Sequence, residues 1–244
     1  MTGDKLVIMK PHSLLLFTSF ALGVGLFGVQ GTVFNMSENN SGAQDVVGHV
    51  GAFRVGIQAG HLKSDEAPEE LSGLHGHGTG ARGGGATEQE VVLKIARLAA
   101  EMLREKGVIV DVLPTTIPPL YRADAFVSIH ADSNPSVVVS GFKLSAPLRG
   151  IEEKSPELED AIYDSYEKAT GLRRDPNITD SMKNYYAFNW RKYQNAVDPF
   201  TPAVIIETGF ITSPFDQRVI VSNPELSARG IADGVFEFLN KDKN

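Results

Sequence analysis

Two histidines and a glutamate stand where strand-like segments of the sequence end. His61 follows the segment FRVGIQAG, His130 follows AFVSI, and Glu207 follows AVII. In open α/β sheets, ligands bind outside the carboxyl ends of the strands, because the side chains and loops that follow the strands gather there. These three side chains can therefore meet at one site. Taken alone, each histidine is more often a polar residue with structural hydrogen bonds than a metal ligand.

Glu88 adds a carboxylate from a different kind of element. It begins a predicted helix directly after a Gly-rich loop. Two histidines and one glutamate from separate elements are a usual ligand set for catalytic zinc, with a fourth position left for water. A second glutamate that does not bind the metal can accept the proton of that water and pass it on. The four residues supply the groups needed for metal-assisted hydrolysis, although a glutamate such as Glu88, taken alone, more often interacts with the helix dipole.

The segments between these residues alternate between strand-like and helix-like patterns. After Glu88, apolar residues recur every three to four positions, and Thr87 with Glu90 forms a capping-box pattern. The expected strands are residues 53–57, 108–113, 125–130 and 203–207, and the expected helices are residues 88–106, 155–170 and 224–239. This alternation predicts an α/β fold, a single three-layer domain with a mostly parallel central sheet and helices on both faces.

Composition excludes several other classes of function. The 244 residues include 23 Lys and Arg against 30 Asp and Glu, which gives a formal charge of −7. Proteins that bind nucleic acid usually present a basic face, so nucleic acid is not an expected partner. The chain has no Cys, which excludes disulfides, thiolate nucleophiles and Cys-bound metals. Any metal must therefore be bound by His, Asp and Glu.

The N-terminal segment has the pattern of an export signal. Lys5 and Lys10 precede an uncharged apolar run from Leu14 to Val29, which is short for a membrane span. We expect residues 1–31 to be a signal peptide or signal anchor, residues 32–51 a polar linker, and residues 52–240 the catalytic domain. The positive flank would keep the N-terminus in the cytoplasm and the rest outside, attached to the membrane if the segment is not cleaved.

Four short motifs follow one another along the chain. They are AGH at 59–61, GARGGGATEQEVVL at 80–93, SIHADS at 128–133 and IIETGF at 205–210. In this order they resemble the motifs of the zinc-dependent N-acetylmuramoyl-L-alanine amidases of the amidase type 3 family. The resemblance extends from about Phe53 to Leu239, and four ordered motifs are far more specific than any single one.

The resemblance implies a role for each candidate residue. His61, Glu88 and His130 match the ligands of a Zn²⁺ ion, and Glu207 matches the catalytic glutamate. Glu90 is a competing candidate for the ligand at the helix start, although Glu88 aligns better. The implied reaction is hydrolysis of the amide between N-acetylmuramic acid and L-Ala of peptidoglycan stem peptides, in cell-wall remodelling. A secreted, wall-associated or membrane-anchored location would suit that substrate.

The chain also departs from the family pattern. The family usually begins this region with Asp-Pro-Gly-His-Gly-Gly, whereas Gln58 and Ala59 replace the first two residues here, and Leu62-Lys63 replaces the last two. The long segment Leu144–Thr201 matches nothing closely. Two alternatives therefore stay open: a zinc hydrolase on the same scaffold that acts on a non-wall amide, and a non-catalytic wall-binding module.

Several further residues have two interpretations each. The five residues of the unmatched segment that could line a sugar or peptide groove are Tyr185, Tyr186, Trp190, Arg191 and Asn195. A packed aromatic cluster is the favoured interpretation of these residues. His75 and His77, two apart in the Gly-rich loop, are either solvated, which is the favoured interpretation, or serve as extra metal ligands or substrate contacts. The sequence gives no prediction of the oligomeric state.

Overall fold

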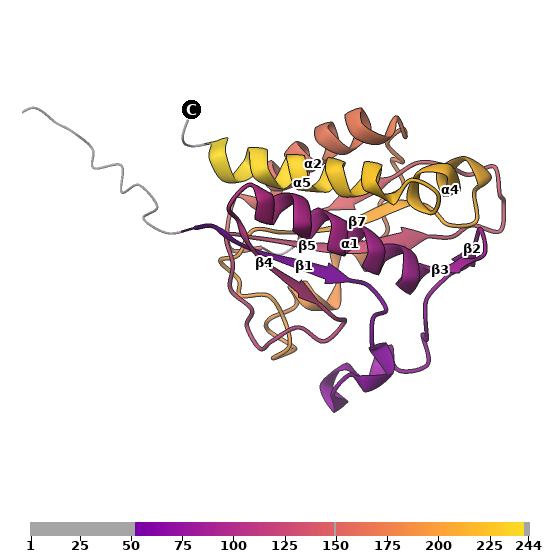
Figure 1. Ribbon diagram of the computed structural model, residues 1–244. Helices are drawn as coiled ribbons and strands as arrows, with labels where there is room; N and C mark the ends of the chain where they lie inside the picture. The colour runs from indigo at the N-terminus through magenta and orange to yellow at the C-terminus, as the bar shows by residue number, and fades with distance from the viewer. Residues whose placement is uncertain (1–51, 149, 242–244) are drawn as a thin grey trace, which may run out of the picture. The chain divides into compact units, whose positions relative to one another are not determined.

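The computed structural model describes residues 52–148 and 150–241, and its centre is a five-stranded sheet (Figure 1). The strand order is β4-β1-β5-β7-β6. The strands are β1 (Arg54–Ala59), β4 (Ile109–Leu113), β5 (Ala125–Asp132), β6 (Lys143–Ser145) and β7 (Ala203–Phe210). β4, β1, β5 and β7 are parallel, and β6 is antiparallel to β7. The predicted mostly parallel sheet is confirmed.

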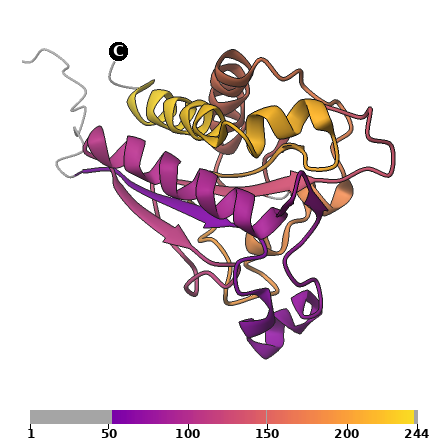
Figure 2. The same ribbon diagram turned by 45° about the vertical axis from the view of Figure 1, so that its right-hand side comes forward.

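Three long helices pack on one face of this sheet (Figures 1 and 2). They are α1 (Glu88–Glu105), α2 (Ser155–Thr170) and α5 (Pro224–Asn240), and the shorter α4 (Pro214–Ile220) precedes α5. α5 packs against both α1 and α2. The crossing with α2 is close, since a Cβ at Gly234 would lie 2.6 Å from the Cα of Ile162. Small residues on α5 thus allow the helices to approach, and the main core forms between them and the sheet.

The opposite face of the sheet has a different cover. A second apolar cluster there includes Ile117, Tyr121, Phe126 and Val197. The covering layer consists of connecting segments with a single 3₁₀ turn, η3 (Tyr186–Phe188), rather than long helices. The α/β class with helices flanking the sheet is confirmed, but the two outer layers are unequal: the long helices share one face.

Two strands continue past the residues at which the sequence patterns end. β5 extends beyond His130 to Asp132, and β7 extends beyond Glu207 to Phe210. In the parallel ladder His130 pairs with Glu207, so these two residues lie side by side on neighbouring strands. The predicted helix starts agree well with the structure, and the capping box of Thr87 and Glu90 is formed.

Several features were not expected from the sequence. α4, the four-residue helix α3 (Asp180–Lys183) and the small hairpin of β2 (Arg82–Gly83) and β3 (Ala86–Thr87) have no strong sequence pattern. The predicted signal segment and linker, residues 1–51, lie outside the described residues. Across the part of the chain that the structure describes, no helix combines the length and the apolar character that membrane crossing requires.

Candidate metal centre and active site

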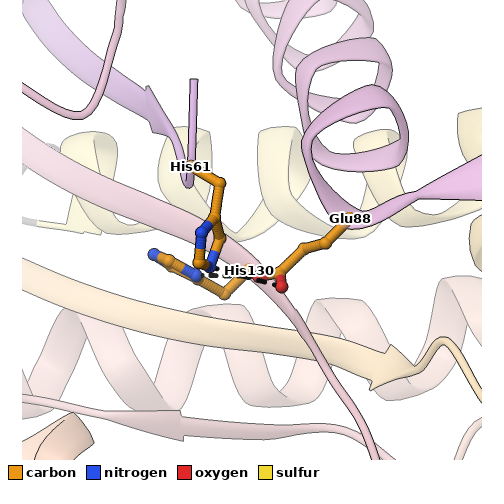
Figure 3. A group of neighbouring side chains, drawn as sticks. All are labelled: His61, Glu88 and His130. Atoms are coloured by element: carbon orange, nitrogen blue, oxygen red, sulfur yellow. Dashed lines mark hydrogen bonds and ion pairs between the residues drawn. The ribbon is translucent and has the colours of Figure 1, made fainter. Parts of the chain in front are cut away.

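The side chains of His61, Glu88 and His130 point toward one another at the carboxyl edge of the sheet (Figure 3). His61 Nε2 lies 3.3 Å from Glu88 Oε2, and His130 Nδ1 lies 2.9 Å from Glu88 Oε1. One ligand atom from each residue lies within 4.8 Å of the others. Two imidazole nitrogens and a carboxylate around a common point are a donor set that suits a divalent cation. The residues present therefore fit a metal ion.

Glu88, and not Glu90, is the carboxylate of this cluster. Glu88 is the first residue of α1, and its carboxylate also accepts hydrogen bonds from the backbone amides of Ala81 and Ala131. The carboxylate of Glu90 accepts hydrogen bonds from the amide and the hydroxyl of Thr87, both at 2.9 Å. Glu90 thus closes the helix start, as a capping box requires, and faces away from the histidines.

The pKa values of the three side chains reflect their close packing. Burial and repulsion from His130 and His77 lower the pKa of His61, although Glu88 opposes this. Burial would raise the pKa of Glu88 and lower that of His130, but their hydrogen bond and mutual attraction outweigh burial in both cases. The pKa of Glu88 is therefore lowered and that of His130 raised. An ionised Glu88 is the form that binds a cation.

Glu207 lies beside this cluster, on the strand next to His130. Its position in β7 puts it between His130 of β5 and Lys143 of β6. Its Oε2 atom is buried and has no hydrogen-bond partner within residues 52–148 and 150–241. Burial raises the pKa of the Glu207 carboxyl to about 8, with repulsion from Glu88 and Asp132 adding to the effect. A carboxyl group with a pKa near neutrality can both take up and release a proton, as a general acid–base group must.

Residues 55–237 match the sequence profile of the family described as N-acetylmuramoyl-L-alanine amidase. The chain belongs to the N-acetylmuramoyl-L-alanine amidase family. This confirms the predicted family and the predicted enzyme class, an amidase. The matched region begins in β1 and ends in α5, so it contains all four candidate residues.

Comparison with individual amidases agrees with this family assignment. The N-acetylmuramoyl-L-alanine amidases AmiA of Escherichia coli and of Salmonella typhimurium are each 28% identical over 214 residues, which covers 68% of this chain and 74% of theirs. The crystal structure of the amidase Ami1 from Mycobacterium smegmatis superposes with a TM-score of 0.59 at 18% identity, covering 79% of this chain and 99% of that one. At that identity the structural likeness supports the fold.

The amidase has a cavity of about 430 Å³ over the metal-ligand cluster. Its lining residues come from five regions of the chain: His61, Ser64, Leu74, His77, Thr115, His130, Ser181, Met182, Asn184, Tyr185, Tyr186, Ile205 and Glu207. A cavity of this volume is typical of a small-molecule or peptide site. The unmatched segment therefore contributes one wall of the amidase cavity.

The residues for which the sequence allowed two interpretations differ in their contacts in the structure. Tyr185 packs against Tyr186 and Phe188, with ring centroids 4.6 and 5.5 Å away, so the favoured aromatic cluster is present and also lines the cavity. Asn195 holds a connecting segment, because its side chain donates to the carbonyl of Ile117. His77 lines the cavity, whereas His75 Nε2 bonds to a backbone carbonyl 2.8 Å away.

Tyr185 also orients one of the candidate metal ligands, a role that the sequence did not indicate. Its hydroxyl lies 3.0 Å from His130 Nε2 and donates to Gln58 Oε1 at 2.9 Å. The Gln58 amide nitrogen donates to the carbonyl of Thr115, which keeps Oε1 directed toward Tyr185. Because the tyrosine proton goes to Gln58, the tyrosine oxygen accepts from His130 Nε2. His130 Nδ1 is then the nitrogen left for a metal.

Replacing Tyr185 with Phe is expected to weaken zinc binding by about 10- to 100-fold, the usual effect of losing the partner that orients a histidine ligand. A zinc titration against a competing chelator measures this. Tyr186→Phe is the matched control, because the Tyr186 hydroxyl bonds to Gln58 and Thr115 and not to a candidate ligand. Equal zinc affinity in wild type and Tyr185→Phe would contradict the orienting role.

Gly60→Ala is expected to displace the His130 ring, because a Cβ at position 60 would overlap that ring and lie 2.6 Å from its Nδ1. Overpacking of this kind costs roughly 1–3 kcal/mol of unfolding free energy. Denaturant unfolding and zinc content of the purified variant measure both consequences. Gly73→Ala is the control, since a Cβ there meets nothing within 4 Å. Full zinc content and unchanged stability in Gly60→Ala would show that the ring has room to move.

The raised pKa of Glu207 predicts a pH-dependent stability of the metal-free amidase. The pKa of the Glu207 carboxyl in the folded state, about 8, exceeds its ordinary value of 4.5, so the folded state holds this proton more tightly than the unfolded state. The contribution of this proton to the free energy of unfolding is therefore fully present below pH 4.5, falls as pH rises, and is lost once pH has passed about 8. Glu207→Gln removes the titrating carboxyl, so the free energy of unfolding of the variant lacks this decrease with pH. In chelator, we expect the variant to be more stable than wild type by roughly 3–5 kcal/mol near pH ~9, and nearly equal near pH ~5. Urea unfolding at both pH values tests this, and a constant difference would contradict it.

Proposed function

We propose that the chain is a zinc-dependent N-acetylmuramoyl-L-alanine amidase in which His61, Glu88 and His130 bind the metal and Glu207 moves the proton. The substrate is the amide between N-acetylmuramic acid and L-Ala of peptidoglycan stem peptides. The observation that carries the proposal is the convergence of three ligand atoms within 4.8 Å beneath a cavity that Glu207 also lines.

The donor set supports zinc as the metal. Two imidazole nitrogens and one carboxylate are typical ligands of catalytic zinc, whereas magnesium and calcium prefer oxygen ligands alone. When bound, the ion supplies a Lewis acid for the scissile carbonyl and a water of lowered pKa. Glu88 and the histidines would then hold the cation instead of their direct contacts with one another.

Glu207 has the properties that proton transfer requires. It is held between His130 and Lys143 in the sheet, so its side chain has a fixed position relative to the ligand cluster. Its unpaired Oε2 is free to accept a proton from the attacking water and to donate it to the leaving amine nitrogen of L-Ala. A buried carboxyl with a raised pKa can hold that proton between the two events.

The location of the enzyme follows from its substrate. Peptidoglycan lies outside the cytoplasmic membrane, and the positively flanked apolar run from Leu14 to Val29 would direct the chain there. We assign residues 1–31 as signal peptide or anchor, 32–51 as linker and 52–240 as the catalytic domain. An uncleaved segment would tether the amidase to the membrane beside its substrate.

The proposal is tested by incubating the full chain with a defined muropeptide and analysing the products by mass spectrometry. We expect release of an intact stem peptide, loss of this activity with a chelator and recovery with zinc. If the muropeptide stays uncut while a small amide is hydrolysed, the substrate is a non-wall amide. Bound zinc without turnover on any wall substrate would instead indicate a non-catalytic binding module.

A further inference from the structure

A second, smaller hollow lies next to the catalytic cavity. The two share Asn184 and Tyr185 in their linings, so the hollow and the catalytic cavity lie on either side of these residues or next to each other along them. The hollow has a volume of about 60 Å³. The hollow is therefore much smaller than the catalytic cavity of about 430 Å³ beside it.

The lining of this hollow is cationic. Lys183 and Arg191 line it together with Asn184, Asn189 and Trp190, and no carboxylate among the described residues lines it. This arrangement stands out because the whole chain carries a formal charge of −7. Two ammonium or guanidinium groups beside two carboxamides offer many hydrogen-bond donors and favour an anionic group.

The two cations are not committed to other partners. In the described residues the Arg191 guanidinium makes no ion pair and lies over the Trp190 ring, 4.4 Å from its centroid. Lys183 has only a distant contact of 3.8 Å with the fully exposed Asp180. Stacking on Trp190 holds the guanidinium in place while its N–H groups remain available, as in many carboxylate-binding sites.

Nearby carboxylates do not neutralise this hollow. Glu152 and Asp198 line a separate small hollow, which shares Trp190 with this one. Glu152 accepts a hydrogen bond from the amide of Ser155, and Asp198 accepts one from the amide of Phe200. In the described residues neither carboxylate forms an ion pair with Lys183 or Arg191, so both cations can still pair with a ligand.

We propose that this hollow, the cationic subsite, binds a free carboxylate of the stem peptide whose first amide is cleaved in the catalytic cavity. This rests on the proposed function. The glycan strand of peptidoglycan consists of N-acetylated sugars without free carboxylates once the lactyl group is amidated, whereas the stem peptide carries such groups. The charge of Lys183 and Arg191 therefore assigns the peptide arm, rather than the glycan, to this side of the site.

The test measures binding and turnover separately. Binding uses the full chain with Glu207→Gln, so that substrate is not consumed, and compares a muramoyl peptide with free carboxylates with the same peptide converted to carboxamides. We expect roughly tenfold tighter binding of the carboxylate form, the effect of one charge-assisted hydrogen bond. Adding Arg191→Gln or Lys183→Gln should reduce that preference severalfold. Lys192→Gln is the matched control, since Lys192 does not line the hollow.

The outcomes distinguish the subsite from the function. Equal affinity for both peptides, or a preference unchanged by Arg191→Gln and Lys183→Gln, would overturn the cationic subsite even if wild type cleaves muropeptide normally. Failure of wild type to cleave either peptide would count against the proposed function, while the binding comparison would still decide whether the hollow recognises a carboxylate. In turnover, we expect the Arg191→Gln change to raise KM for the carboxylate form and leave kcat nearly unchanged.

Discussion

Replacing Glu207 with Gln is expected to lower kcat by about 10²- to 10⁴-fold, the usual contribution of a positioned general acid–base group. Gln has the same shape but accepts no proton at its carbonyl oxygen under these conditions. The substitution leaves His61, Glu88 and His130 in place, so the variant should keep full zinc content. It removes a buried carboxyl whose Oε2 has no partner, so the fold should not be destabilised.

Two measurements on the purified full chain check this expectation: kcat on a defined muropeptide, and bound zinc. Glu90→Gln is a matched control, because it makes the same chemical change two residues from a candidate ligand at a glutamate that serves only the capping box. That control should lose some helix stability and keep its kcat. A Glu207→Gln variant with kcat within about twofold of wild type would remove Glu207 from the proton transfer.

The sequence predicted that His61, Glu88 and His130 would lie together, because their motifs resemble in order those of the amidase family and each residue stands at the end or start of a local pattern. Thr87 and Glu90 define the start of α1 to the residue, and that start places Glu88 at the helix N-terminus. The apolar runs before His61 and His130 form neighbouring parallel strands, so their ends meet at the same edge. Local patterns and the expected pairing of parallel strands therefore agreed on where these side chains would meet.

The sequence favoured a packed aromatic cluster over a groove lining for Tyr185 and Arg191, and it did not predict the orienting role of Tyr185 or the proposed cationic subsite, since both depend on long-range packing. Tyr185 is 55 residues from His130 in sequence, in a segment without helix or strand periodicity, and its hydroxyl contacts both His130 and Gln58. Gln58 is also where the first motif departs from the family pattern. The two departures from the family pattern therefore contact each other. Gln58 accepts a hydrogen bond from the hydroxyl of Tyr185 in the unmatched segment, and Tyr185 in turn contacts His130.

The uneven outer layers have a similar cause. Strand and helix patterns predict how many elements exist but not the face on which each connection runs. The segment after β4 and the segment around η3 cover one face with Ile117, Tyr121 and Val197, and this cluster leaves no place for a long helix. The segment around η3 also places Tyr185 and Tyr186 at the carboxyl edge of the sheet. This segment therefore both covers the face of the sheet and forms a wall of the cavity.

Removing the metal is expected to abolish turnover and to lower thermal stability together. A ligand that binds only the folded state stabilises it by about 4 kcal/mol at a thousandfold excess over its Kd, so zinc should raise the Tm of the chelator-treated chain by several degrees. Activity should return over the same range of zinc concentrations, because one site produces both effects.

His61→Ala separates this site from incidental zinc binding. The substitution removes one of three ligand atoms within 4.8 Å, so both the zinc-dependent rise in Tm and the turnover should be lost. His75→Ala is the matched control, since His75 bonds to the carbonyl of Ala67 and lies outside the cluster. A zinc response that survives in His61→Ala would place the stabilising ion elsewhere. If His61→Ala loses the response and His75→Ala keeps it, the ion that supports catalysis and the ion that stabilises the fold occupy the same site.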